Sequence, residues 1–251
     1  MMLEDRITET IKEKLAELDR PDLFREPHVG FSAADDEMFA KLKELIGPWH
    51  FLPSDILPDA KSVISFYVPF TRDVAAEPRG TEHGSAKWGE AYEEINKHFG
   101  IISDAVIELL KSQGFKGEKI PATHTYDPKE LKCKWSHRSA AVIAGLGSFG
   151  ANRLVITEKG SAVRFCTVIT DASLKPSPSY DGPKCLYYVD GSCGKCFDIC
   201  PAKALDKGNI DKFVCQKELN NNEAIAKETT HLKGADTCGK CISICPFAYI
   251  D

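Results

Sequence analysis

Eight of the ten cysteines in this chain fall into a pattern typical of iron–sulfur clusters. Six of them stand in two copies of a Cys-x2-Cys-x3-Cys-Pro run, at residues 193–201 and 238–246. In two-cluster ferredoxins such runs hold cubane clusters, and the cysteine before the proline reaches the cluster of the other run. Two cubanes need eight thiolates, and Cys185 and Cys215 are placed to supply the two that the runs lack.

The sequence therefore predicts two 4Fe-4S clusters with crossed ligands, able to pass single electrons. We assign the first to Cys185, Cys193, Cys196 and Cys245, and the second to Cys200, Cys215, Cys238 and Cys241. Cys133 and Cys166 remain, and we interpret them as buried thiols that pack like small apolar side chains.

Two other interpretations of the cysteines are open. Two Cys-x2-Cys pairs suit a structural zinc ion, which takes four nitrogen or sulfur ligands. That interpretation leaves Cys200, Cys245 and the prolines after them without a purpose. Disulfides need an oxidising compartment, and nothing in the sequence indicates one.

The composition of the chain limits the kinds of partner that it is expected to bind. The chain has 251 residues, a formal net charge of −5 and a hydrophobic fraction of 43%, which is ordinary for a globular protein. It has no run rich in lysine or arginine, which argues against a nucleic-acid partner. It also has no stretch of about 20 apolar residues and no apolar leader. We expect a cytoplasmic protein without a membrane partner, in a reducing and anaerobic cell.

Local patterns predict the elements that position these residues. Helical periodicity covers residues 3–18, 38–46, 88–109 and 136–145, and β-branched or aromatic runs predict strands over 62–70, 153–157 and 162–170, the last two as a hairpin. Residues 71–86 are predicted to form a long functional loop. A Pro/Ser/Gly-rich stretch divides a cofactor or substrate domain, residues 1–175, from a ferredoxin-like domain, residues 176–251.

Several landmarks resemble one known family. They are Ala144-Gly145-Leu146-Gly147-x-x-Gly150-x-Asn152, Gly160-Ser161, Thr170-Asp171-x-x-Leu174, the two cysteine runs, and earlier residues 57–64 and Trp88-Gly89-x-x-Tyr92. Over residues 50–251 the chain resembles the epoxyqueuosine reductases and, more distantly, the reductive dehalogenases.

The resemblance implies an α+β (α/β) fold. A nitroreductase-like or cobalamin-processing-like domain would precede a two-cluster bacterial ferredoxin-like domain. It also implies a base-off cobamide whose cobalt is reduced by the nearer cluster. The expected cofactor contacts are Gly147, Gly150, Asn152, Ser161 and Thr170. The implied partners are a low-potential electron donor such as ferredoxin or flavodoxin, and a small-molecule substrate or a corrinoid.

Three departures from the family bear on the activity. No acidic residue lies between Trp135 and Ala144, where the family places its catalytic aspartate. The chain ends six residues after Cys245, where epoxyqueuosine reductases continue with helical repeats, and it lacks the twin-arginine signal of respiratory dehalogenases. Reduction still needs a proton source, and the candidates in the right segment are Tyr126, His137 and Arg138, with His124 beside them.

Three functions follow as hypotheses. The first is an iron–sulfur oxidoreductase that reduces a cobamide or a small substrate on the first domain. The second is an electron-transfer protein, or a corrinoid-reducing partner, without a substrate of its own. The third is an epoxyqueuosine (tRNA) reductase, against which we weigh the acidic charge balance and the missing aspartate.

Overall fold

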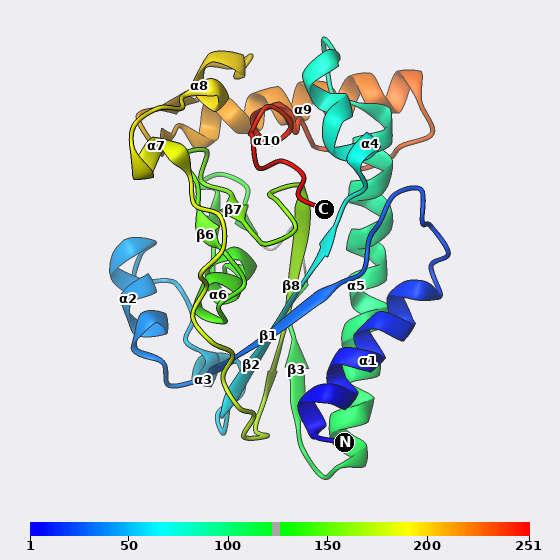
Figure 1. Cartoon of the computed structure of the whole chain (residues 1–251), viewed down its shortest axis with the longest axis vertical. Helices are drawn as coiled ribbons and strands as arrows, with labels where there is room; N and C mark the ends of the chain where they lie inside the picture. The colour runs from blue at the N-terminus through cyan, green and yellow to red at the C-terminus, as the bar shows by residue number, and fades with distance from the viewer. Residues whose placement is uncertain (122–125) are drawn as a thin grey trace.

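A four-stranded antiparallel sheet lies at the centre of the computed structural model (Figure 1), which describes residues 1–121 and 126–251. The strand order is β1-β2-β8-β3, and each neighbouring pair is antiparallel. In chain order the elements are α1 Leu3–Ala16, β1 His28–Ala33, α2 Glu37–Leu45, α3 Pro53–Ile56, β2 Ser62–Pro69, α4 Arg72–Ala76, η1 Glu77–Gly80, α5 Ala86–Ser112, β3 Gly117–Lys119, β4 Tyr126–Asp127, β5 Lys132–Cys133, α6 His137–Ile143, β6 Ser148–Phe149, β7 Val155–Ile156, β8 Val163–Thr170, α7 Leu186–Val189, α8 Lys195–Ile199, β9 Leu205–Asp206, β10 Asn209–Ile210, α9 Lys212–Thr229 and α10 Lys240–Ser243.

Helices cover both faces of the sheet, so its central strand β2 is buried at every residue. Side chains alternate between the two faces of a strand. Phe66 therefore packs toward α5, edge-on to Phe99, while its neighbour Tyr67 packs with Ala141 of α6. α1 closes the first side with Ile7, Ile11 and Leu15. The result is the mixed helix-and-sheet core that the sequence predicted.

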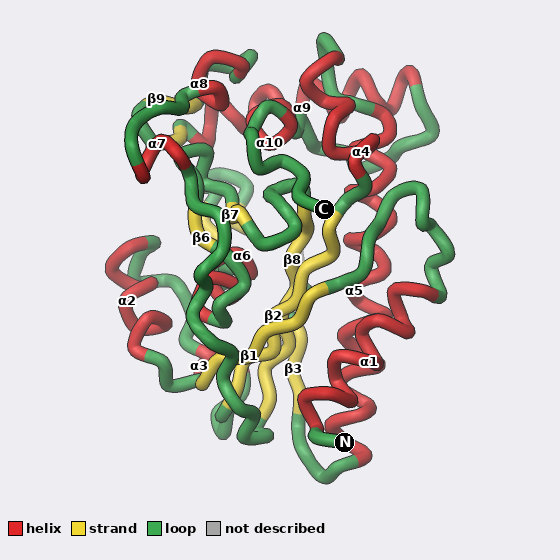
Figure 2. Tube along the Cα trace, in the orientation of Figure 1, coloured by secondary structure: helices red, strands yellow, loops and turns green. Residues whose placement is uncertain are grey.

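The cysteine-bearing helices α7 to α10 gather at one end of the sheet (Figure 1). Residues 171–184 reach them as a long loop that runs from the far end of β8 (Figure 2). This loop is tied to the sheet, because Ser177 and Phe31 exchange two hydrogen bonds of 2.9 Å.

The predicted hairpin is wrong. β7 pairs with β6, and β8 pairs with β2 and β3 instead. After the tight turn at Gly160 the chain forms backbone hydrogen bonds with the C-terminal residues. The N–H groups of Ser161 and Ala162 donate to the carbonyls of Phe247 and Ala248, at 2.8 and 3.0 Å.

The predicted long loop is also wrong. Residues 72–80 form α4 and η1, which pack on α10 of the cysteine region. The Ser243 hydroxyl donates to Ala76 O at 3.0 Å and accepts from Arg79 N at 3.3 Å. Residues 72–80, which were predicted to be part of a loop, therefore cover the second cysteine run.

Several elements were not predicted, and β1 and α9 are the longest among them. Strand β1 is short and interrupted by Gly30, and α9 has few apolar residues to mark a helical face. Asp211 begins α9 as an N-cap, accepting from the N–H groups of Phe213 and Val214.

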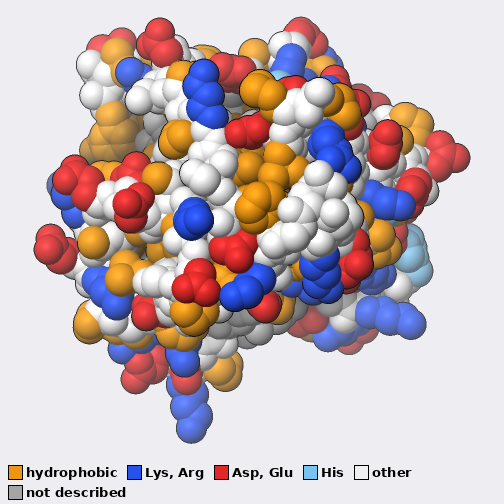
Figure 3. Space-filling model, turned by 90° about the horizontal axis from the view of Figure 1, so that it is seen from below, with side chains coloured by type: hydrophobic (Ala, Val, Ile, Leu, Met, Phe, Trp, Pro, Cys, Tyr) orange, Lys and Arg blue, Asp and Glu red, His pale blue; other side chains and the backbone are white. Residues whose placement is uncertain are grey.

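The surface carries mixed charge. On the face seen in Figure 3, acidic and basic side chains are interspersed. None of the helices in the described part of the chain combines the length and the apolar character that crossing a membrane requires.

Candidate functional site

The four cysteines predicted to hold the first cluster lie close enough for their charges to shift one another's pKa values. Burial raises the pKa of Cys196 to about 11, and the charges of Cys185, Cys245 and Cys193 raise it further. The pKa of Cys245 is also raised, by burial first and then by Cys185 and Cys193. Cys245 belongs to the second run in the sequence, yet the cysteines whose charges act on it are Cys193 of the first run and Cys185 just before that run. We call Cys185, Cys193, Cys196 and Cys245 the first thiol group.

The other four behave as a second group. Burial raises the pKa of Cys215 to about 11, with further contributions from Cys200 and Cys238. The pKa of Cys241 is raised by burial and then by Cys238, Cys215, Cys200 and, last, Cys196 of the first group. Cys200 and Cys215 share an apolar cluster with Cys196 and Cys241, so the two groups adjoin. We call Cys200, Cys215, Cys238 and Cys241 the second thiol group.

The chemistry of both groups fits an iron–sulfur cluster. Burial disfavours the thiolate form, and neighbouring thiolates repel one another. A bound cationic centre offsets both effects and favours ionisation. Backbone N–H groups point at the sulfurs, from Ala151 to Cys185 Sγ at 3.5 Å and from Ala204 to Cys200 Sγ at 3.3 Å. None of the ten cysteines forms a disulfide. Within the described residues, no three His, Cys, Asp or Glu side chains are close enough to hold a single metal ion.

The two remaining cysteines differ from each other. Cys166 is buried as predicted, 2% exposed, and burial raises its pKa to about 11. The prediction for Cys133 is only partly right, since this thiol is half-buried and donates to Trp135 O at 2.7 Å.

The predicted cofactor contacts join the sheet to the cysteine region. The Asn152 amide donates to Cys241 O at 3.0 Å, and its oxygen accepts from Leu154 N at 3.2 Å. A Cβ on Gly147 would lie 2.5 Å from Ile156 O, so the protein's own backbone fills that space.

The other three contacts are also packed within the protein. Gly150 lies against Asn152 Oδ1, 3.0 Å from where its Cβ would be. Ser161 is buried, and its hydroxyl lowers the pKa of Cys245 against the effect of burial. The Thr170 hydroxyl donates to Lys116 O at 2.7 Å.

Arg138 lies beside the second thiol group. Burial lowers the pKa of Arg138 and so does the charge of Arg164, whereas Cys133, Cys241 and Cys215 oppose that shift. Arg138 is nevertheless open to solvent, so it does not lie in the packed core. Its Nη1 donates to Arg153 O at 3.0 Å.

Arg164 projects from β8 toward α5. Its guanidinium lies 4.5 Å from the centre of the Tyr92 ring and donates to Asn96 Oδ1 at 3.1 Å. Its Nε is buried without a hydrogen-bond partner among the described residues. The Tyr92 hydroxyl donates to Asp236 Oδ1 at 2.8 Å. Neither Arg164 nor Asp236 was predicted from the sequence as a site residue. A single charge inside an otherwise apolar strand pattern was the available signal for Arg164.

Tyr126 lies near two acidic side chains. Burial raises the pKa of its phenol, and the charges of Asp236 and Glu223 raise it further. The phenol is therefore protonated at neutral pH. The structure brings Arg138 near the second thiol group and Tyr126 near Asp236 and Glu223, whereas His124 lies outside the described residues.

His137 is held by hydrogen bonds at both ring nitrogens. Nε2 lies 3.1 Å from Pro121 O and Nδ1 lies 2.8 Å from Thr167 Oγ1. A carbonyl can only accept, so Nε2 carries the hydrogen and Nδ1 accepts from Thr167. Burial lowers the pKa of His137 to about 4. The ring is neutral at pH 7, and this geometry supports a positioning role.

The shift at His137 predicts a pH dependence of stability. An unfolded histidine titrates near 6.5, whereas folded His137 titrates at about 4. Between these values the unfolded chain binds a proton that the folded chain does not, so the free energy of unfolding falls as pH falls. We expect His137→Gln to reduce the stability difference between pH 7 and pH 5, measured by urea unfolding. The control is His231→Gln at an exposed position. An unchanged difference in His137→Gln would contradict the assignment.

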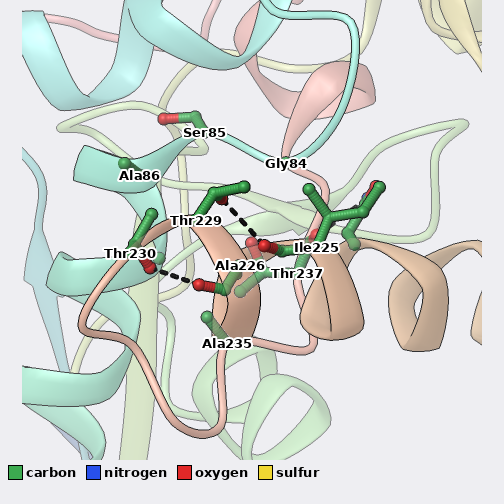
Figure 4. Close-up of a pocket in the computed structure, with 11 residues that line it drawn as sticks. Gly84, Ser85, Ala86, Ile225, Ala226, Thr229, Thr230, Ala235 and Thr237 are labelled. Atoms are coloured by element: carbon green, nitrogen blue, oxygen red, sulfur yellow. Dashed lines mark hydrogen bonds between the residues drawn. The ribbon is translucent and has the colours of Figure 1, made fainter.

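Two cavities lie elsewhere. The pocket in Figure 4, between α5 and α9, has a volume of about 30 Å³ and is lined mainly by small residues such as Gly84, Ala226 and Ala235. That volume suits one or two water molecules. The other, about 330 Å³, is lined by Phe51, Asp55, Ile56, Lys119, Ile120, Pro121, Lys134 and Trp135, with no cysteine among them.

Fold and cysteine arrangement together define a candidate iron–sulfur redox protein. The chain matches no known protein-family model. It is 28% identical to the epoxyqueuosine reductase of Bacillus subtilis (strain 168) over 199 residues, which cover 74% of this chain and 47% of that protein. It is 30% identical to that of Bacillus cereus over 187 residues, 70% of this chain and 44% of the relative. The chain thus spans less than half the length of these two relatives.

Solved structures agree on the fold. An epoxyqueuosine reductase in complex with an epoxyqueuosine-modified tRNA stem loop superposes with a TM-score of 0.56 at 20% identity, covering 96% of this chain and 66% of that one. A reductive dehalogenase associated with B12-dependent dehalogenation superposes with a TM-score of 0.58 at 16% identity, covering 89% and 30%. The resemblance expected from the sequence is confirmed: the chain is similar in sequence to epoxyqueuosine reductases and shares its fold with them and with a reductive dehalogenase.

Proposed function

We propose that this chain is an iron–sulfur reductase of the epoxyqueuosine reductase type, with one 4Fe-4S cluster on each thiol group. The observation that carries the proposal is the crossed grouping: Cys245 interacts with the first run, and Cys200 with Cys215 and the second run. Two adjoining clusters provide a path for single electrons. The ferredoxin-like domain of residues 176–251 is part of this proposal, as is a low-potential donor protein.

The region around Arg138, beside the second thiol group, is the proposed reaction site. Arg138 and Arg164 would hold and orient the bound group, and Tyr126 would store a proton for it. His137 would fix the chain at Pro121. When bound, a cobamide would supply a cobalt that accepts electrons singly. We propose it beside Arg138 and not over Gly147, where the protein's own backbone occupies the space.

The comparisons favour a tRNA substrate more than the sequence analysis did. The relatives are epoxyqueuosine reductases, and one structural neighbour holds a tRNA stem loop. We therefore propose an epoxyqueuosine-like nucleoside as the first substrate to test, and a small molecule as the second. The experiment is anaerobic turnover of an epoxyqueuosine-modified tRNA stem loop by the chemically reduced protein. Lack of product would reject this substrate.

Cobalamin binding is tested separately. We expect the anaerobic protein to convert added cobalamin to the base-off form, seen as a shift in its visible spectrum. Arg164→Gln should weaken this binding by about tenfold, the loss of roughly one charged hydrogen bond. Arg153→Gln serves as a control, since its side chain bonds the exposed Asn209. No shift, together with fast reduction of a protein acceptor, would favour the electron-carrier hypothesis.

A further inference from the structure

Each cysteine run contains the same four residues, Cys-Gly-Lys-Cys, but the two lysines have different surroundings. Lys195 of the first run is exposed to solvent. Lys240 of the second run is only 6% exposed. A buried ammonium is costly unless it is paired and hydrogen-bonded. The two runs have the same sequence here, yet only Lys240 is buried, and its burial requires compensating interactions.

The partners of Lys240 are two carbonyl groups. Its Nζ donates to Pro78 O at 3.3 Å and to Thr81 O. These carbonyls come from η1 and the residue after it, the segment that covers α10. Among the described residues, no carboxylate lies within ion-pair distance of Lys240. The carbonyls satisfy its hydrogen bonds but leave its charge uncompensated.

The packing around the second run holds this arrangement in place. Gly239 has φ +74°, and a Cβ there would lie 2.8 Å from Trp88 Cε2 and 2.9 Å from Pro78 Cγ. The turn that carries Lys240 is thus pressed against α5 and η1, and water is kept from the lysine. In the first run, Gly194 meets only Phe197, at 3.4 Å and beyond.

The buried ammonium lies within the second cysteine run. Lys240 stands between Cys238 and Cys241, two proposed ligands of the second thiol group. In the first run the equivalent lysine, Lys195, is exposed to solvent, which weakens the effect of its charge. A buried cation therefore adjoins the second thiol group, whereas its counterpart in the first run is solvated.

We propose that Lys240 raises the reduction potential of the cluster on the second thiol group above that of the first, and so sets the direction of electron flow. This inference rests on the proposed function. The potential of an iron–sulfur cluster depends on net charge, hydrogen bonds and solvent exposure. A fixed buried cation stabilises the extra electron of the reduced cluster.

The direction agrees with the position of the two groups. The first group is next to exposed apolar residues, Tyr188 and Val189, which are 54% and 61% exposed and follow Cys185 closely. The second group adjoins Arg138, which is open to solvent and belongs to the proposed reaction site. Electrons would enter at the first cluster and come to rest at the second, where they are used.

The test is an anaerobic redox titration of the iron-loaded protein, followed by electron paramagnetic resonance. In the wild type we expect two separate one-electron steps. Lys240→Gln, which keeps a donor for Pro78 O, should lower the ratio of reduced to oxidised second cluster about tenfold at fixed potential, or about 59 mV for one electron. Lys240→Arg should restore it, and the matched variant Lys195→Gln should leave both steps unchanged.

Three results would overturn the inference: a wild type whose clusters titrate together, a second cluster unmoved in Lys240→Gln, or an equal shift in Lys195→Gln. If Lys240→Gln fails to fold, a wild type whose clusters titrate together still overturns the inference, and Lys240→Arg, which keeps the charge, should leave both potentials unchanged. A wild type that binds no iron would instead reject the proposed function, so the two failures are distinguishable.

Discussion

Cys200→Ala is expected to lower the iron content of the reconstituted protein from about eight to about four per chain, because a cubane needs four thiolates. Crossed ligation makes a sharper prediction for double variants. Cys200→Ala combined with Cys241→Ala should retain about four irons, since both residues serve the second cluster. Cys200→Ala combined with Cys196→Ala, two changes within one run, should remove nearly all the iron. Iron analysis and absorption spectra of anaerobically purified protein measure both.

The control is Cys166→Ala, which alters a buried thiol that packs beside Ser103 and belongs to neither group. Its iron content should equal that of the wild type. If Cys200→Ala with Cys196→Ala kept half the iron, each run would hold its own cluster and the crossed assignment would be wrong. One zinc per chain in place of iron would favour the structural-zinc interpretation.

Tyr126→Phe is expected to lower the rate of substrate reduction by about 100-fold or more, the usual contribution of a positioned proton donor. The phenol is suited to this role because burial and the charges of Asp236 and Glu223 raise its pKa, which keeps it protonated at neutral pH. Cluster spectra and iron content should remain unchanged, since Tyr126 is not a ligand. Single-turnover kinetics with the epoxyqueuosine-modified tRNA stem loop measure the effect.

Tyr187→Phe is the matched control. Its ring packs edge-on to Phe197 with centroids 5.1 Å apart, beside the first thiol group. It should leave the rate unaltered. A Tyr126→Phe protein with the wild-type rate would remove Tyr126 from the reaction and direct attention to Tyr92, which donates to Asp236.

Much of the fold could be predicted because its signals are local. Residues 62–70 were correctly predicted as a strand, and the helix over 88–109 lies within α5. The hairpin failed because the backbone donors of Ser161 and Ala162 are taken by Phe247 and Ala248, more than 80 residues away. A local sequence pattern does not indicate a hydrogen-bond partner so far away in the chain.

The sequence by itself was enough to predict the ligand chemistry, because within each run the spacing is short enough for the local chain to bring its cysteines close together. Tertiary structure decided the environment of those ligands. Lys195 and Lys240 have identical neighbours in sequence, yet only Lys240 meets carbonyls about 160 residues away, at Pro78 and Thr81. Arg164 and Asp236 likewise both contact Tyr92 of α5, although they lie far from it in the sequence. Burial and charge compensation depend on such distant contacts, because they arise where separate segments pack.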